Sequence, residues 1–431
     1  MIDRVERHEL VAVDPKEHPP DRPRDFAKEH ERLCYRAAAM AVAEDVPPAR
    51  EDGPAGRRIS IAMVAIAILF AAFTGFRMPS RWCATLDAVS LFDGFHRRFF
   101  VGTVLRPLAL ATDFDYWLFA GFAFAVLLAL LAVLIVAAAR AELLTQRVLV
   151  IAWLLLPTGG FLFHDVGYLE QLLYLLVFAA IGLLRRNRLV AAAAVMCVTP
   201  WIHEIAVLTV IPVFGLIALR TLPFRRALAV TVPAAVLNAI VLLFSPASVE
   251  VVERMTATLS RANFVARPDA LALFTWTLSN HHQKYNVYAQ LIAVRPVAIA
   301  LVGAFVALWL ADRTLRRAAG PVPAVVVLLA SCVAIAAPGL AILGGWDGNR
   351  WLFLIMANFF IVVWFALDNR GARELGRGAL MILATALLVL SHFSIYYFDD
   401  YAPRELGSRP DRKLFLRQVF DHSLFAMPTG A

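Results

Sequence analysis

Residues 189 to 220 read LVAAAAVMCVTPWIHEIAVLTVIPVFGLIALR, an apolar run interrupted at its middle by Pro200, Trp201, His203 and Glu204. Arginines flank the run on both sides, at 185, 186 and 188 and at 220, 225 and 226. Cationic loops stay in the cytoplasm, so the chain must cross outward and return within this run. The first dozen or so residues rise only about 18 Å as helix, short of a hydrocarbon core of about 30 Å. The turn carrying His203 and Glu204 is therefore expected below the outer membrane surface, where charged groups need protein or water around them.

The composition places the whole chain in the membrane. It has 431 residues, is 60% hydrophobic and has a mean hydropathy of +0.69, with many separate apolar runs. These features predict an all-α polytopic bundle of transmembrane helices. The formal charge of +8 lies mostly in short loops between spans, so it reflects topology and indicates no nucleic-acid partner. The four cysteines lie in different regions, without a CxxC pair or a disulfide framework.

Three segments follow from the distribution of polar residues. Residues 1–57 are polar, lack the apolar stretch of a signal peptide and are expected to form a largely disordered cytoplasmic tail. Residues 58–396 form the predicted transmembrane domain, and 397–431 an extracytoplasmic tail. We expect eleven spans, at 59–76, 116–139, 148–163, 170–184, 189–201, 204–219, 227–244, 290–310, 321–343, 351–367 and 379–396. The amino terminus then lies in the cytoplasm, and the expected location is a bacterial inner membrane.

Polar residues suited to chemistry gather on the predicted outer side. Each of the five cytoplasmic loops carries arginine, and none holds a Gly-rich phosphate loop or a His-carboxylate cluster. The outer connections include two long loops, 77–115 and 245–290, and three shorter ones with acidic or histidine residues. These shorter connections hold His164, Asp165 and Glu170, then His203 and Glu204, then Asp347 and Arg350. The working face is therefore predicted to be extracytoplasmic.

The first outer loop breaks the charge rule, because it holds Arg97, Arg98 and Arg106 on the disfavoured side. A guanidinium fork suits phosphate oxygens, so these arginines are candidates for binding a substrate phosphate. The alternative is that Arg97 and Arg98 snorkel to lipid headgroups from an amphipathic helix in the interface. Asp93 in the same loop is a candidate general base, with a structural ion pair to a nearby arginine as the alternative.

Two further pairs join the candidates. His164 and Asp165 follow Pro157, Gly159 and Gly160, which are expected to kink the third span. Capping of the next helix by Asp165 is the alternative to a catalytic role. Asp347 and Arg350 head a later span, with an i, i+3 ion pair as the alternative to substrate binding.

No metal motif stands out. The run His203-Glu204-Ile-Ala-Val lacks the second histidine of an HExxH helix, and His281-His282 is interpreted as an exposed pair. We therefore expect no metal site and no cofactor, while a divalent cation stays an alternative.

The runs GFHRRFFVGTVLRP, PWIHEIAVL and GWDGNRW, on a many-span frame with a long first outer loop, resemble segments of bacterial membrane proteins near the GT-C glycosyltransferases and the O-antigen polymerase- or ligase-like proteins. This resemblance implies a GT-C-like bundle with an acidic residue of the first outer loop, Asp87 or Asp93, at the site. The two are not adjacent, which departs from the metal-binding version. In the polymerase- and ligase-like branch, arginines and a histidine act without metal, which maps to Arg97, Arg98, Arg350 and His203.

The implied function is a membrane glycosyltransferase or polysaccharide polymerase for cell-envelope glycans. Nucleotide-sugars are not supplied outside the inner membrane, so the donor is expected on a polyprenyl phosphate, with a glycan or lipid acceptor and membrane lipids as partners. Arginines would stabilise the leaving phosphate, and Glu204 or Asp93, with His203, would deprotonate the acceptor. The alternative is a secondary transporter or flippase with its substrate or proton site at His203-Glu204. A scaffold of an envelope assembly is the third reading.

Overall fold

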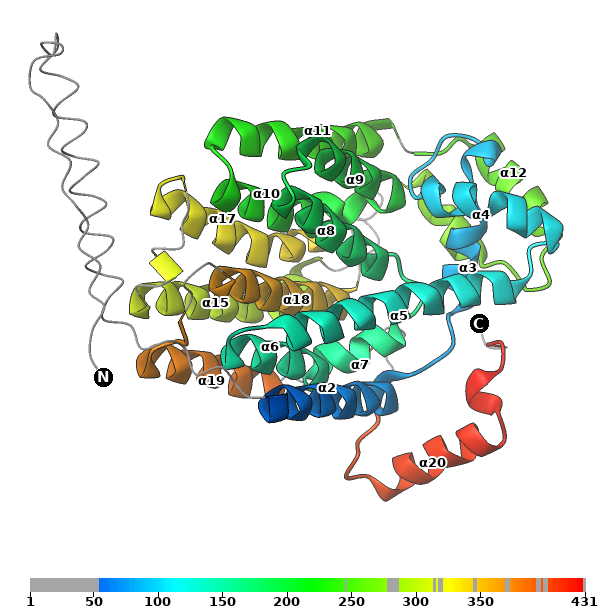
Figure 1. The fold of residues 1–431 in the computed structure, drawn as a ribbon. Helices are drawn as coiled ribbons and strands as arrows, with labels where there is room; N and C mark the ends of the chain where they lie inside the picture. The colour runs from blue at the N-terminus through cyan, green and yellow to red at the C-terminus, as the bar shows by residue number, and fades with distance from the viewer. Residues whose placement is uncertain are drawn as a thin grey trace, which may run out of the picture. The chain divides into compact units, whose positions relative to one another are not determined.

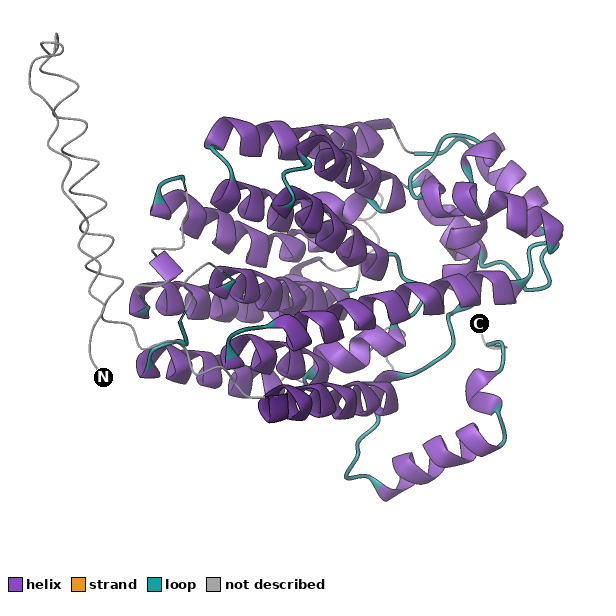
Figure 2. Ribbon diagram, in the orientation of Figure 1, coloured by secondary structure: helices purple, strands orange, loops and turns teal. Residues whose placement is uncertain are grey.

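The computed structural model describes residues 54–244, 246–276, 287–312, 315–316, 321–343, 347–368, 373–392, 397 and 402–428. The chain divides into two units, Met1–Glu51 and Asp52–Ala431, and the first lies outside the described residues. Within the described ranges every regular element is a helix, as Figure 2 shows, which confirms the all-α prediction.

The helices follow one another with short connections. The first half holds α2 (Pro54–Gly75), α3 (Arg81–Ala88), η1 (Leu91–Asp93), α4 (Phe99–Ala111), α5 (Tyr116–Arg140), α6 (Leu144–Leu155), α7 (Pro157–His164), α8 (Glu170–Arg185), α9 (Leu189–Ile202), η2 (Glu204–Val207) and α10 (Val210–Thr221). The second half holds α11 (Phe224–Phe244), α12 (Val249–Leu259), α13 (Pro268–Ala272), η3 (Leu273–Thr275), α15 (Val287–Ala311), α17 (Ala324–Ala336), η4 (Ala337–Leu343), α18 (Gly348–Leu367), α19 (Arg377–Ser391), α20 (Arg409–Phe420) and η6 (Ser423–Phe425).

The chain is a multi-pass membrane protein. Seven helical segments in the described part are long and apolar enough to cross a membrane, or eight if the bent pair α6–α7 is one span. Three shorter apolar helices, α4, α9 and α19, accompany them. Each of the eleven expected spans falls largely on helix, while eleven crossings stays a prediction.

The bend between α6 and α7 confirms the expected kink. The two helices meet at 56°, and Pro157 begins α7, where its missing N–H costs no helical hydrogen bond. A Cβ on Gly159 would lie 1.9 Å from the carbonyl oxygen of Leu154, so only glycine permits this close return of the chain.

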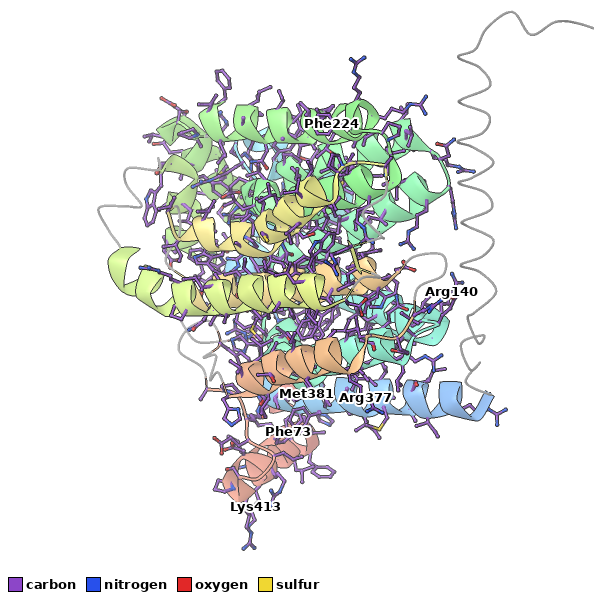
Figure 3. The ribbon with its side chains drawn as sticks, turned by 90° about the vertical axis from the view of Figure 1, so that its left-hand side faces the viewer. Phe73, Arg140, Phe224, Arg377, Met381 and Lys413 are labelled. Atoms are coloured by element: carbon purple, nitrogen blue, oxygen red, sulfur yellow. The ribbon has the colours of Figure 1, made fainter. Side chains whose placement is uncertain are left out.

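The short helices gather at one end of the bundle. Figure 1 shows α3, α4 and α12 together, and α3 packs on α4 and α13 while α12 packs on η1 and α13. We call the group formed by α3, η1, α4, α12, α13 and η3 the loop end. Helix α5 runs from this end to Arg140, which lies in Figure 3 on the same side of the bundle as Arg377 at the start of α19.

Helix α18 forms the centre of the bundle and is almost wholly buried. Its Asn358 accepts a hydrogen bond from the Tyr174 hydroxyl at 3.0 Å. The Asn358 amide donates to the carbonyls of Ala334 at 2.7 Å and Thr209 at 3.1 Å. A buried amide with its partners present fixes neighbouring helices against one another. This network thus sets the register of α8, α10 and α17 on α18, the helices beside the candidate site.

The contact of α4 with the end of α3 yields a stability prediction. A Cβ on Gly102 would lie 1.9 Å from the carbonyl oxygen of Val89, which is backbone and cannot rotate away. We expect Gly102→Ala to lower the free energy of unfolding by about 1–3 kcal/mol, the usual cost of overpacking. Thermal unfolding in one detergent or lipid measures the change.

Gly121 in α5 provides the control. A Cβ there would meet nothing within 4 Å. Gly121→Ala is expected to be neutral or stabilising by up to about 1 kcal/mol, because alanine favours helix. Equal stability of the two variants would contradict the close packing of α4 on α3.

Candidate functional site

The break in the run 189–220 starts at Pro200. Proline has no N–H, so the carbonyl of Met196 lacks its helical donor, and the Thr199 hydroxyl donates to that oxygen instead at 2.7 Å. Helix α9 then ends at Ile202, and His203 has extended backbone before the turn η2 begins. The sequence prediction of a broken helix at this point is confirmed.

Six ionisable side chains converge on the break. They are Arg97 and Arg98 just before α4, Glu170 at the start of α8, His203 and Glu204 at the break, and Arg350 in the first turn of α18. We call them the ion cluster. No side chain in the cluster is more than 12% exposed. Charges this deeply buried must be paired, and these are.

Glu204 is held by two arginines. The Arg98 guanidinium donates two hydrogen bonds to this carboxylate, from Nε to Oε2 at 2.9 Å and from Nη2 to Oε1 at 2.5 Å. Arg97 Nη1 lies 3.5 Å from the same Oε1, and Arg97 also donates to the carbonyl of Leu273. The Glu204 carbonyl accepts from the Asn238 amide at 3.0 Å. A bidentate pair of this kind fixes orientation as well as charge.

Arg98 has a rare backbone conformation. Its φ of 64° and ψ of 16° lie in the left-handed region, which residues other than glycine seldom adopt, and it directly precedes the first turn of α4. Such a conformation costs free energy and persists where the surrounding structure fixes it. Here it accompanies two consecutive arginines that both reach Glu204.

Arg350 anchors the other end of the cluster. Its guanidinium donates to Glu170 Oε1, lies 3.3 Å from His203 Nε2, and stands 4.6 Å from the centre of the Tyr168 ring. Helix α18 starts here because the Asp347 carboxylate accepts the backbone N–H of Arg350 at 3.1 Å. Asp347 thus caps the helix that presents Arg350.

His203 bridges the two glutamates. Its Nδ1 lies 3.2 Å from Glu204 Oε2, and its Nε2 lies 3.6 Å from Glu170 Oε1. The backbone N–H of Ile205 also donates to Nδ1, at 3.2 Å. An imidazole with a carboxylate beside each nitrogen is arranged to take a proton from one side and release it on the other.

The ion cluster contains three arginines and two glutamates, so it has one more positive than negative charge. Glu170 pairs with Arg350, which leaves the excess beside α4, where Arg97 and Arg98 share Glu204. A guanidinium pair with a single carboxylate can accept a further anion, and phosphate suits its geometry. The snorkelling alternative does not fit these two arginines, because both pair with Glu204 and their side chains are only 10% and 12% exposed.

Asp93 and Arg106 form a separate ion pair. The Asp93 carboxylate accepts from the Ser90 N–H at 2.8 Å and the Thr258 hydroxyl at 2.7 Å, and Arg106 Nη1 lies 3.4 Å away. This clamp joins η1, α4 and α12. The ion pair expected as the alternative for Asp93 is present, and within the described part no hydrogen bond joins its carboxylate to the ion cluster.

His164 and Asp165 end α7 close to the cluster. The His164 ring stacks on Tyr397 at 4.6 Å, so it faces the carboxyl-terminal segment. Asp165 is buried, and burial raises its pKa well above the ordinary value against the opposing charge of Arg350. The alternative in which Asp165 caps α8 is wrong, because α8 is preceded by Leu169 at the cap position.

Glu170 belongs to the ion cluster but was not among the residues predicted to bind substrate or catalyse. It could have been predicted because it is an acidic residue at the start of an otherwise apolar helix. Asp87, the other acidic residue of the first loop, is buried in α3, where burial raises its pKa well above the ordinary value. His281 and His282 lie outside the described residues. Among the residues that the structure describes, no group of three His, Cys, Asp or Glu side chains is placed to hold a metal ion.

His96 at the loop end gives a prediction of pH dependence. It is fully buried, with Nδ1 2.7 Å from the carbonyl of Gly94 and its ring 4.9 Å from Phe274. Burial lowers its pKa from 6.5 to about 4. As pH falls below 6.5 the unfolded chain binds a proton here before the folded chain does, so stability is lost. At pH 4.5 the loss is about 2–3 kcal/mol relative to pH 7.

Replacing the imidazole tests this effect. His96→Gln keeps a donor for Gly94 but does not titrate. The difference in thermal unfolding between this variant and the parent is expected to shift in the variant's favour between pH 7 and 4.5. A difference that stays constant over this range would mean that His96 titrates normally in the folded protein.

No protein-family model, curated protein or solved structure matches the chain. The ion cluster, its burial and its place at a helix break are therefore the observations from which a function can be argued.

Proposed function

We propose that this protein transfers glycosyl groups from a polyprenyl-phosphate-linked donor, at the extracytoplasmic face of a bacterial inner membrane, to a glycan or lipid acceptor of the cell envelope. The observation that carries the proposal is that Arg97 and Arg98 share one buried carboxylate, Glu204, beside His203 at a break between apolar helices. This arrangement supplies an anion site and a base within reach of one another.

The arginines would bind the phosphate of the donor. A phosphate that enters beside α4 would accept hydrogen bonds from Arg97 or Arg98 in place of Glu204. This exchange is possible because two arginines share one carboxylate on that side. As the bond from sugar C1 to the phosphate oxygen breaks, the electron pair leaves with the phosphate. The guanidinium groups are already aimed at that position and stabilise the growing charge.

Glu204 and His203 would handle the proton. The acceptor hydroxyl oxygen forms the new bond to C1, and its proton passes to Glu204 once Arg98 has turned to the phosphate. His203 Nδ1, 3.2 Å away, can then take the proton from Glu204 and restore the carboxylate. Release of this proton from His203 to water returns the enzyme to its starting state, so the products are the lengthened acceptor, the carrier phosphate and one proton, and no co-reactant is needed.

An aromatic cluster beside the arginines supports a lipid-linked donor. Phe95, Phe99 and Trp201 pack together with ring centres 5.1–6.3 Å apart. Phe95 is 40% exposed, so this apolar surface is open next to the anion site. A prenyl chain would pack on it while its phosphate reaches Arg98.

The bridging histidine also favours a second candidate, a proton-coupled transporter or flippase. His203 connects Glu204 and Glu170 at 3.2 and 3.6 Å, a chain along which a proton can move. Intramembrane carboxylate and histidine chains of this type serve as proton relays in pumps and transporters.

One preparation distinguishes the two functions. The purified protein is reconstituted in sealed vesicles with a glycan linked to polyprenyl phosphate or to polyprenyl diphosphate, and carrier release, product size and internal pH are followed together. Carrier release with a lengthened glycan, lost in Glu204→Gln but kept in the exposed control Glu250→Gln, supports glycosyl transfer. Glu204-dependent proton or solute movement without carrier consumption would replace the transferase by the transporter.

A further inference from the structure

The carboxyl-terminal helix α20, Arg409–Phe420, faces away from the bundle with a cationic and apolar surface. Its outward row is Arg409, Lys413, Leu416 and Phe420, spaced at four, three and four residues, so these side chains share one face. Leu416 is 52% exposed and Phe420 79% exposed, and none of the residues of α20 is buried. Figure 3 shows Lys413 pointing away from the other helices.

The charge of α20 is mainly positive. Arg412 and Arg417 lie on either side of the outward row, so the helix carries four cations against one acid, Asp411. Arg417 pairs with Asp421 at 3.9 Å across exposed surface, which leaves it available to another anion.

The helix is fixed at the end of α2. The backbone N–H of Arg404 donates to the Thr74 carbonyl at 3.0 Å, and its guanidinium donates to the Phe76 carbonyl at 3.0 Å. The Phe415 ring on α20 packs edge-on against Phe73 at 5.2 Å. Since α2 is a candidate span that ends at Gly75, these contacts hold α20 level with the boundary of the hydrocarbon core.

We propose that α20 docks on the surface of an anionic lipid leaflet. Leu416 and Phe420 enter the boundary between headgroups and acyl chains, and the cations on both sides bind lipid phosphates. This is the pattern of an interfacial helix, with apolar side chains between cationic ones. The inference is independent of the proposed glycosyl transfer.

Two observations favour lipid over another occupant. The outward surface of α2 beside it is itself apolar, with Leu69 71% exposed, so lipid already covers the adjoining surface of a membrane-spanning helix. The net charge of α20 is complementary to an anionic leaflet and repels a second copy of the same face.

Spin labels measure the docking directly. Cysteines replace Leu416 or Phe420 in a full-length chain whose native cysteines are changed to alanine, and the labelled protein is placed in nanodiscs. With one-third phosphatidylglycerol, both labels are expected to collide with oxygen more often than with a water-soluble nickel reagent. A label at the exposed residue Glu405 is the aqueous reference. Labels at 416 and 420 that match this reference would overturn the proposal.

Charge substitutions separate lipid binding from self-association. Lys413→Gln with Arg417→Gln is expected to lower the docking equilibrium constant roughly fivefold per cation in anionic discs and to have little effect in phosphatidylcholine. The matched pair Arg225→Gln with Arg226→Gln, exposed at the start of α11, is expected to leave docking unchanged. Equal docking in both lipids, or loss of docking in discs holding a single copy, would exclude the anionic leaflet as the partner.

Discussion

Glu204→Gln is expected to lower turnover about 10²–10⁴-fold, the usual worth of a positioned general base. It is also expected to lower the free energy of unfolding by about 3–5 kcal/mol, because it leaves Arg97 and Arg98 buried with no carboxylate between them. Carrier release in lipid vesicles measures the first effect, and thermal unfolding in the same lipid measures the second.

A double variant separates the two effects. Arg98→Gln alone leaves Glu204 with the more distant Arg97 and should also destabilise the protein, whereas Arg98→Gln with Glu204→Gln removes one charge of each sign. The double variant is therefore expected to recover much of the stability and none of the turnover. Arg261→Gln, which loses only an exposed pair with Asp113, is the control for removing an arginine. Recovered turnover in the double variant would show that the pair is structural and that the reaction centre lies elsewhere.

Much of the helical organisation could be predicted from the sequence, because apolar runs and prolines act locally. The bend at Pro157 and the break after Pro200 could be predicted because a proline does not continue the hydrogen bonding of the helix before it, which needs no knowledge of the neighbours. The number of crossings is harder to predict, since α4, α9 and α19 are shorter than the core is thick. The tail after Tyr397 was expected only as a segment, and its packing against α2 depends on contacts more than 300 residues apart in sequence.

The sequence predicts which residues belong to the candidate site better than it predicts which of them form ion pairs. Arginine on the disfavoured side of the membrane pointed to Arg98, and a charged pair inside an apolar run pointed to Glu204, because burial of an unpaired charge is too costly to persist. Arg350 was a candidate because it heads a later span. Which charge pairs with which is set by packing, since Arg98 meets Glu204 across 106 positions and Arg350 meets Glu170 across 180. Asp93 was chosen because it lies in the first outer loop close to Arg97 and Arg98, yet its carboxylate is bound by Ser90, Arg106 and Thr258.

Arg350→Gln is expected to destabilise the protein by about 3–5 kcal/mol, because Glu170 would stay buried without its cation. Arg350→Lys is expected to keep part of this stability but to lose the planar stacking on the Tyr168 ring, since lysine lacks the planar group. Thermal unfolding in lipid measures both variants.

A double variant that replaces both charges of this ion pair separates stability from turnover. Glu170→Gln with Arg350→Gln removes both charges, so most of the stability should return while the helix cap at Asp347 stays in place. Turnover in this folded variant then decides whether Glu170 and Arg350, which lie beside Nε2 of His203, contribute to the reaction. If Glu170 receives the proton that leaves Glu204, turnover falls and its dependence on pH changes. If turnover and its pH profile equal those of the parent, the pair serves only to hold α8 against α18, and the reaction involves the α4 side of the cluster alone.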